Sequence, residues 1–383
     1  MEKVSLVKCS SYDDKEVYNA VKKSVELIDG LKIKDNSKVL IKPNLLRPSH
    51  PNTNTTTHPS IVKAVIKLLK EKKCNVFVGD GPGFHDPKTT AKVCGILDVC
   101  KEENVPFVDF TDKKSYLIED AMLIKRHDFA KIIDEVDYII NLPKLKTHVQ
   151  MGITFAVKNT FGFIPGLNKS KLHLKLADKE KFAMMLLDVH NFIKPNINII
   201  DAVFGMEGNG PTNGTSKKVG LIASSHDALA LDIVMCKVVS FNPLDFWTNR
   251  VGLRLKEKDF IENIKITGEK LDEVKINFKH PEVNSIQFGL PKFVHEIIHN
   301  LIVSKPKVNS KKCVACQECI RICPAKTIHL KKYGKKQVAW INKKDCIRCF
   351  CCHEICNYDA IDIKKSILGE PLERLGKLLS KRQ

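Results

Sequence analysis

Eight cysteines near the C-terminal end of the sequence have the spacing of iron–sulfur ligands. Two runs share one pattern, Cys313-x-x-Cys316-x-x-Cys319-x-x-x-Cys323 and Cys346-x-x-Cys349-x-x-Cys352-x-x-x-Cys356. A tight loop turns the first three thiolates of a run onto one face, whereas the fourth lies on the next helical turn and points to a second cluster. The sequence therefore predicts two 4Fe–4S clusters. One is bound by Cys313, Cys316, Cys319 and Cys356, and the other by Cys346, Cys349, Cys352 and Cys323.

Two other uses of these cysteines fit the pattern less well. A zinc site takes two pairs of ligands rather than two runs of four. Disulfides belong to oxidising compartments and small secreted chains, and nothing else in this sequence indicates either. Cys351 is a ninth cysteine without a ligand position in the pattern, so we expect it to be a non-ligand.

The cysteine-rich segment resembles the bacterial two-cluster ferredoxins over about residues 308–364. The two halves repeat each other, and residues 327–330 and 337–341 are expected to form a hairpin around Tyr333-Gly334-Lys335. The segment departs from the ferredoxin pattern at Asn357, which replaces the usual proline after the last cysteine without removing a ligand. A small α+β two-cluster ferredoxin-type domain is thus expected over residues 306–365.

The composition allows several domains and does not by itself select a partner. A chain of 383 residues with 43% hydrophobic residues has room for two or three domains with a sizeable core. The net charge of +19 would suit nucleic acid, an anionic surface or an acidic substrate. The lysines are scattered and no RNA-module aromatic motif is visible, which argues against nucleic acid.

The remaining cysteines and the N-terminal end indicate a reducing environment. Each of these cysteines lies alone in an apolar run, so we expect core thiols. The first residues are too polar for a signal peptide, and no apolar run reaches membrane-spanning length. We therefore expect a cytoplasmic protein of an anaerobic cell without a membrane span. The cysteines in question are Cys9, Cys74, Cys94, Cys100 and Cys236.

Before the cysteine runs, strand and helix patterns alternate, which is the signature of an α/β domain with a mainly parallel sheet flanked by helices. We place this domain at residues 1–305, with Pro306 at the boundary after a lead-in helix at 293–303, and a basic amphipathic tail at 366–383. The expected strands are 3–8, 38–41, 75–78, 107–110, 136–141, 196–200 and 219–223, with a hairpin at 115–124. The expected helices are 14–28, 59–72, 90–102, 179–192 and 226–239.

Polar residues follow several of these strands, and ligands of such sheets bind beyond the carboxyl ends of the strands. Each residue alone has an ordinary structural explanation, such as a turn or a helix cap. Together they predict a candidate site. Asp80, His148 and Lys158 are the catalytic candidates, and the substrate-binding candidates are Lys42, Asn44, His58, Lys144, Lys146, Asn159, Asp201 and Glu207.

The cationic residues of this set suggest an anionic substrate. Lys144, Lys146 and His148 alternate, so an extended chain would turn all three to one side, where they could hold a carboxylate or phosphate. The alternative is a solvated strand end. Lys158 stands in an apolar run, and burying a lysine is costly unless it is paired or loses its proton. Anion binding, proton transfer or a Schiff base are its possible uses.

Two glycine-rich segments bear on how a ligand would be bound. Residues 205–214 contain too many glycines to be held by their own side chains, which suggests a lid that closes over substrate. Gly79-Asp80-Gly81-Pro82-Gly83 lacks the Gly-Lys-Ser/Thr ending of a P-loop and is not the dinucleotide fingerprint. The sequence therefore predicts neither ATP nor NAD as a ligand.

At these residues the sequence resembles the "domain of unknown function 362" iron–sulfur proteins over about residues 1–240. The resemblance lies in Ile41-Lys-Pro-Asn, Thr57-His-Pro-Ser, Gly79-Asp-Gly-Pro-Gly, Asn141-Leu-Pro-Lys-Leu-Lys-Thr-His, Val157-Lys-Asn-Thr-Phe-Gly, 201–210 and 227–232. It implies iron–sulfur binding but no settled reaction. A fainter similarity is to the N-terminal part of nickel-pincer lactate racemases, in which a histidine and then a lysine also follow a strand.

Two functional hypotheses follow. In the first, the protein is a ferredoxin-linked oxidoreductase that takes electrons from a redox partner protein and passes them to an anionic small molecule at the strand ends. In the second, it is an electron carrier or assembly factor whose α/β domain docks a partner protein. A third hypothesis, nucleic-acid modification, would rest on the charge alone.

Overall fold

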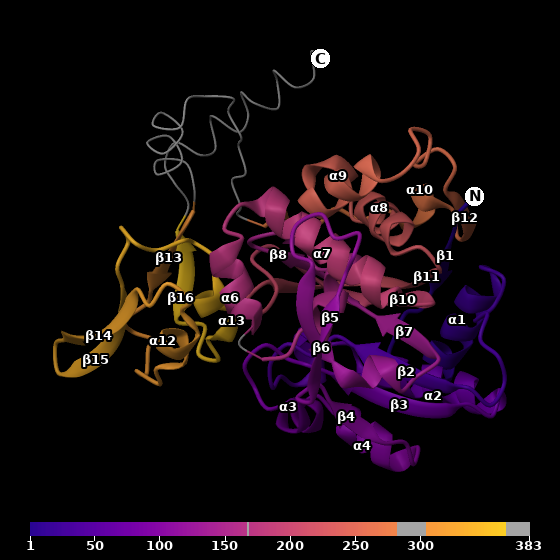
Figure 1. Ribbon diagram of the computed structural model, residues 1–383, viewed down its shortest axis with the longest axis horizontal. Coiled ribbons are helices and arrows are strands. Elements are labelled where there is room, and N and C mark those ends of the chain that lie inside the picture. Colours follow the sequence, from indigo (N-terminus) through magenta and orange to yellow (C-terminus); the bar gives the residue numbers. More distant parts are fainter. Residues whose placement is uncertain (167, 282–303, 365–383) are drawn as a thin grey trace. The chain divides into compact units, whose positions relative to one another are not determined.

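The computed structural model describes residues 1–166, 168–281 and 304–364, and the chain divides into two compact units, Met1–Lys279 and His280–Gln383 (Figure 1). The division falls before the boundary that we placed at Pro306. The expected lead-in helix at 293–303 and the basic tail lie outside the described residues.

The first unit is built on a ten-stranded, mostly parallel sheet. The strands β10, β7, β2, β3 and β4 run parallel to one another, and β12 is parallel to β1. The strand β11 is antiparallel to both of its neighbours, β1 and β10. The order is β12 (Lys265–Gly268), β1 (Lys3–Lys8), β11 (Thr215–Ser225), β10 (Ile197–Glu207), β7 (Tyr138–Leu142), β2 (Lys38–Pro43), β3 (Asn75–Asp80) and β4 (Phe107–Asp109), with β8 (Lys144–His148) beside β10 and β9 (Gly152–Ile153) beside β8.

Both faces of this sheet are covered, because successive residues of a strand point to opposite sides. On β2, Leu40 belongs to one hydrophobic cluster, and Val39 and Ile41 belong to the other. The first cluster includes residues of α7 (Lys179–Ile193), α8 (Ala228–Val238) and α9 (Trp247–Arg254). The second includes residues of α1 (Asp14–Glu26), α2 (Pro59–Glu71) and α4 (Ile96–Glu102). The predicted α/β class with helices flanking a mainly parallel sheet is therefore confirmed.

Most predicted elements of this unit are present, and several need correction. The hairpin expected at 115–124 is formed by Lys113–Leu117 and Arg126–Ala130, and the strand expected at 219–223 spans Thr215–Ser225. The single helix expected at 90–102 is two helices, α3 (Pro87–Val93) and α4, because Gly95 between them is left-handed with φ 78°. The strand expected at 196–200 continues to Glu207 as β10. The smaller elements are β5 (Lys113–Leu117), β6 (Arg126–Ala130), α5 (Ala156–Asn159), α6 (Asn168–Lys175) and α10 (Leu271–Val274), with 3-10 turns at Pro51–Thr53, Lys131–Asp134, Thr160–Phe163 and Pro243–Asp245.

Within residues 304–364, the second unit has two short helices and two antiparallel strand pairs, which Figure 1 shows in orange and yellow. The predicted hairpin is confirmed as β14 (Ile328–Tyr333) and β15 (Lys336–Ile341), with Gly334 left-handed in its turn. The other pair is β13 (Lys305–Val308) and β16 (Ile361–Lys364). The helix α12 (Glu318–Ile322) precedes Cys323, and α13 (Cys351–Ile355) precedes Cys356.

The internal repeat of the second unit extends to its backbone. Ala315 and Gln317 are left-handed in the first cysteine run, and Arg348 and Phe350, at the same positions of the second run, are left-handed as well. A left-handed conformation is uncommon for residues other than glycine. Its recurrence at matching positions indicates that both runs fold as the same kind of loop.

The apolar segments of the first unit are buried in its core. The isolated cysteines expected to be core thiols are all buried, between 0% and 8% exposed. Among the described residues, no helix is long and apolar enough to cross a membrane.

Candidate functional site

The carboxyl ends of β2 and β3 carry a buried ion pair. Lys42, one residue before the end of β2, has its Nζ 2.7 Å from Asp80 Oδ1, and the two side chains are 0% and 2% exposed. The other carboxylate oxygen of Asp80 accepts the backbone N–H of Leu45 at 2.7 Å, and Lys42 also donates to Pro43 O at 2.9 Å. The backbone of Gly162 passes so close that an added Cβ would lie 2.3 Å from Asp80 Oδ1. Only glycine fits at this position.

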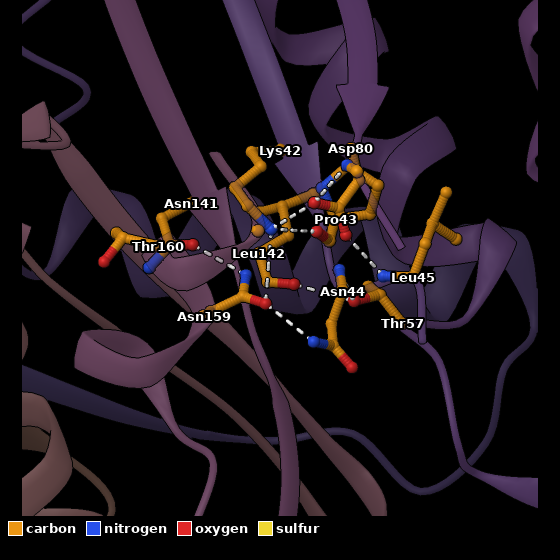
Figure 2. Close-up of polar contacts among 12 residues, drawn as sticks. Lys42, Pro43, Asn44, Leu45, Thr57, Asp80, Asn141, Leu142, Asn159 and Thr160 are labelled. Atoms are coloured by element: carbon orange, nitrogen blue, oxygen red, sulfur yellow. Dashed lines mark hydrogen bonds and ion pairs between the residues drawn. The ribbon is translucent and has the colours of Figure 1, made fainter. Parts of the chain in front are cut away.

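Amide side chains extend this pair into a network (Figure 2). Asn159 Oδ1 accepts from Asn44 Nδ2 at 2.7 Å and from Lys42 Nζ at 3.4 Å, and Asn159 Nδ2 donates to Asn141 Oδ1 at 2.7 Å. Lys146 Nζ then donates to Asn44 Oδ1 at 2.6 Å and to the backbone oxygen of Thr55. Five residues from four separate segments thus form one hydrogen-bonded group. We call Lys42, Asn44, Asp80, Lys146 and Asn159 the strand-end network.

A second group lies at β8 and β10, whose register pairs Lys144 with Asp201. Lys144 Nζ is 2.9 Å from Asp201 Oδ2, with both side chains 0% exposed. Tyr12 joins them, because its hydroxyl donates to Asp201 Oδ1 at 2.9 Å and accepts from Lys144 Nζ at 2.6 Å. Burial and the Asp201 charge raise the pKa of Tyr12, so its hydroxyl keeps its proton.

His58 is attached to this second group through its backbone and its ring. Its N–H donates to Asp201 Oδ2 at 2.9 Å, and its ring stacks on Tyr12 with centroids 3.6 Å apart. His58 Nδ1 accepts the N–H of Ser60 at 3.3 Å, so the expected helix cap is present. Burial lowers the pKa of His58 to about 4, and the ring is neutral at pH 7.

Three predicted site residues have other surroundings. His148 Nδ1 accepts the N–H groups of Gln150 and Met151 at 3.1 and 3.2 Å. Glu207 Oε2 accepts the N–H of Lys279 at 2.9 Å and lies 3.3 Å from Lys217 Nζ. Lys158 is half-buried, and its Nζ lies 5.9 Å from the centroid of the Phe161 ring.

The structure excludes one alternative and corrects two expectations. Lys144, Lys146 and His148 are each 1% exposed, so they are not a solvated strand end. Lys158 was expected to be buried, but its neighbours Ala156, Val157 and Asn159 take the buried positions of α5 instead. The segment 205–214 is not a loosely held lid, because Thr147 Oγ1 donates to Gly208 O at 2.7 Å and Val149 N donates to Gly210 O at 3.0 Å.

Sequence reasoning missed Asp232 and Lys169, two buried ionisable residues that contact segments of the predicted site. Asp232, on α8, accepts the N–H groups of Ala156 and Val157 at 2.7 and 3.2 Å and so positions the turn that carries Asn159. Burial raises its pKa to about 7. Lys169 is 7% exposed and donates to the backbone oxygens of Gly81 and Gly162. Asp232 lies in residues 227–232, a segment that carries the family resemblance, so the sequence contained a signal for it. The polar sequence around Lys169 contained no such signal.

The surroundings of Lys169 predict how stability depends on pH. Burial, and then the charges of Lys42 and Lys158, lower its pKa from 10.5 to about 7, although Asp80 opposes the shift. Between pH 7 and 10.5 the unfolded chain holds a proton on Lys169 that the folded chain lacks, so the free energy of unfolding should rise with pH. The contribution is at most about 1.4 kcal/mol per pH unit.

We expect Lys169→Met to flatten this rise. Urea unfolding between pH 7 and pH 10 measures it, and Lys171→Met, at an exposed position of the same helix, should keep the wild-type slope. Equal slopes for the wild type and Lys169→Met would show that Lys169 keeps its proton in the fold.

In the second unit, the eight cysteines of the two runs line two different hollows, four in each. One hollow is lined by Cys313, Cys316, Cys319 and Cys356 and encloses about 360 Å³ of space, part of it open to solvent. The other encloses about 300 Å³ and is lined by Cys323, Cys346, Cys349 and Cys352. Cys351, expected to be a non-ligand, is 2% exposed and also lines the second hollow.

The fourth cysteine of each run accepts a hydrogen bond at the equivalent place. The N–H of Thr327 donates to Cys323 Sγ, and the N–H of Ala360 donates to Cys356 Sγ, both at 3.3 Å. The N–H of Ala339 donates to Cys313 Sγ at 3.4 Å. Such donors stabilise a thiolate more than a thiol. Burial raises the pKa of a different thiol, Cys319, to about 12.

Each hollow offers four cysteine sulfur atoms as possible metal ligands. Within the described ranges, no three His, Cys, Asp or Glu side chains converge as they do around one metal ion. A 4Fe–4S cubane binds each thiolate through a different iron, so its ligands stand farther apart than those of one ion. An all-cysteine donor set is taken by iron–sulfur clusters and also by structural zinc.

Most of this chain is similar to known proteins. The family model described as "Domain of unknown function (DUF362)" matches residues 39–237. The "Thylakoid-associated protein sll1697" of Synechocystis sp. (strain ATCC 27184 / PCC 6803 / Kazusa) is 31% identical over 311 residues, which are 79% of this chain and 95% of that protein. The lactate racemase apoprotein from Thermoanaerobacterium thermosaccharolyticum matches with a TM-score of 0.39 and 13% identity, over 60% of this chain and about half (54%) of that one.

Proposed function

Since the chain belongs to the DUF362 family, whose description gives no activity, we propose from its own residues that it is an electron-transfer protein with two 4Fe–4S clusters. The observation that carries the proposal is the grouping of eight cysteines around two hollows of similar size. The grouping crosses the two runs, with Cys356 beside the first and Cys323 beside the second. A two-cluster ferredoxin module crosses its ligands in the same way, which supports the proposal.

The residues around each hollow fit this group. The cluster, when bound, supplies one-electron transfer, at potentials that span roughly −700 to +450 mV depending on its surroundings. The chain supplies four thiolates per hollow, backbone N–H donors to three sulfur atoms, and loops bent by left-handed residues at matching positions. Burial raises the pKa of Cys319, Cys346 and Cys352, and the positive charge of bound iron would favour their thiolate form.

Anaerobic purification followed by iron, sulfide and zinc analysis tests the proposal. We expect about eight irons and as much sulfide per chain, together with an electron paramagnetic resonance signal after reduction. Protein that carries zinc and no iron would overturn the proposal.

We further propose that the first unit makes the protein a redox enzyme that acts on an anionic small molecule at the strand ends. The support is a group of buried lysines at these strand ends. Lys42, Lys144, Lys146 and Lys169 are at most 7% exposed, and the carboxylates of Asp80 and Asp201 contact Lys42 and Lys144. Half-buried Lys158 is the candidate for contact with the substrate. Asp80 is held by Lys42 and Leu45, so it acts as a positioning residue rather than as a free acid or base.

An electron carrier or assembly factor, whose first unit docks a partner protein, is the alternative. It is favoured by the low exposure of the strand-end network, in which Lys42, Asp80, Lys146 and Asn159 are between 0% and 3% exposed. Untargeted metabolite comparison of a deletion strain with its parent separates the two functions. For an enzyme, one anionic metabolite should accumulate, and the wild-type gene but not Lys158→Ala should reverse it, with Lys171→Ala as the exposed control. Reversal by Lys158→Ala would favour the carrier.

A further inference from the structure

A small hollow beside Cys346 is lined by positive charge. Its lining consists of Lys305, Pro306, Ile341, Lys343, Cys346 and Arg348. Three of these six residues are cationic, and none of the lining residues that the structure describes is a carboxylate. Lys343 is exposed, whereas Lys305 and Arg348 are half-buried. We call Lys305, Lys343 and Arg348 the cationic notch.

The hollow of the other cysteine set has a different border. Besides its cysteines it is lined by Gln317, Glu318 and less polar residues, of which Val314 and Tyr358 are 54% and 49% exposed. The two cysteine sets are therefore equivalent in their loops but not in their surface charge. The internal repeat does not require the cationic notch, which needs its own explanation.

The cationic notch brings like charges together at some cost. The pKa of Lys305 lies below its usual value because of burial and because Arg348 and Lys343 lie near it. The whole segment 304–364 is basic, since it has 14 Lys and Arg against 5 Asp and Glu, a net charge of +9. Crowded cations favour a bound anion, and complementary charge accelerates and orients protein association.

We propose that the cationic notch is the docking site for an acidic electron-carrier protein, whose redox centre it brings beside Cys346. The inference rests on the proposed function, because Cys346 is one of the assigned cluster ligands. In each encounter the carrier loses one electron and this chain gains one, and no bond or proton changes place. A role confined to neutralising the cluster's own thiolates is the competing explanation, and it predicts no effect on binding of a carrier.

Binding of an acidic plant-type ferredoxin by the intact, iron-loaded protein tests the inference. Calorimetric titration at low and high ionic strength would compare the wild type with Lys343→Glu. The matched control is Lys335→Glu, which changes the net charge equally in the turn of the β14–β15 hairpin, at the opposite end from Ile341. We expect Lys343→Glu to weaken binding by about tenfold at low ionic strength, and the difference to shrink at high ionic strength. Lys335→Glu should change affinity by less than about twofold.

Iron and sulfide are measured on every variant to separate the two proposals. Iron-loaded wild type that does not bind the ferredoxin, Lys343→Glu that binds as the wild type does, or equal weakening by both substitutions would each overturn the docking site and leave the clusters standing. Wild-type protein without iron would overturn the proposed function, and the docking site with it.

Discussion

Replacing Lys42 by methionine is expected to lower the free energy of unfolding of the first unit by about 3–5 kcal/mol. The substitution leaves the carboxylate of Asp80, 2% exposed, without its cation 2.7 Å away. Removing one partner of a buried ion pair costs this much because the other charge stays buried and uncompensated. The N–H groups of Leu45 and Gly81 still bind Asp80, which places the expected cost toward the lower end.

The double variant Lys42→Met/Asp80→Asn should recover much of the loss, because it removes both charges together. Lys63→Met is the matched control. Lys63 bridges Asp14 and Glu102, which are 51% and 58% exposed, and such surface pairs contribute at most about 1 kcal/mol. Urea unfolding followed by Trp247 fluorescence in a Trp340→Phe background reports on the first unit alone. A loss of unfolding free energy no larger than that of Lys63→Met would show that the Lys42–Asp80 pair stabilises the fold no more than a surface ion pair does.

The sequence was sufficient to predict which strands deliver polar residues to the sheet edge. Apolar runs of strand length are local signals, and parallel strands bring their carboxyl ends together wherever they occur. For this reason Lys42, Asn44, Asp80 and Asn159 were expected near one another, and the structure brings them into hydrogen-bonding contact. What the sequence could not give is the pairing of each charge. Lys144 contacts Asp201 because β8 pairs with β10, a contact between distant segments.

Lys158 and Lys169 show why the sequence did not predict which individual side chains are exposed. Lys158 lies in an apolar run, yet a helix turns successive residues by about 100°, and α5 buries its neighbours instead. Lys169 lies among polar residues, yet it reaches the backbone oxygens of Gly81 and Gly162, which are brought to it by the tertiary fold. Local hydrophobicity predicts whether a segment is buried, but it does not predict which side chain of a short turn faces the core.

Double cysteine substitutions are expected to show which thiolates share a cluster. If Cys323 and Cys349 line the same hollow, as the structure has them, then Cys323→Ala and Cys349→Ala damage the same cluster. The double variant should then keep about four of about eight irons, like each single variant. Cys323→Ala combined with Cys316→Ala damages both clusters, because Cys316 lines the other hollow, and should keep almost no iron.

The iron contents of the two double variants distinguish the two ligand assignments, because an assignment by proximity in the sequence predicts the opposite result. If each run held one cluster by itself, Cys316 and Cys323 would be partners, and their double variant would be the one that keeps about four irons. Cys351→Ala is the matched control, since Cys351 lines the hollow of Cys349 but has no place in the ligand pattern. It should keep about eight irons. Loss of half the iron in Cys351→Ala would instead make Cys351 a ligand and displace one of the four cysteines assigned to that hollow.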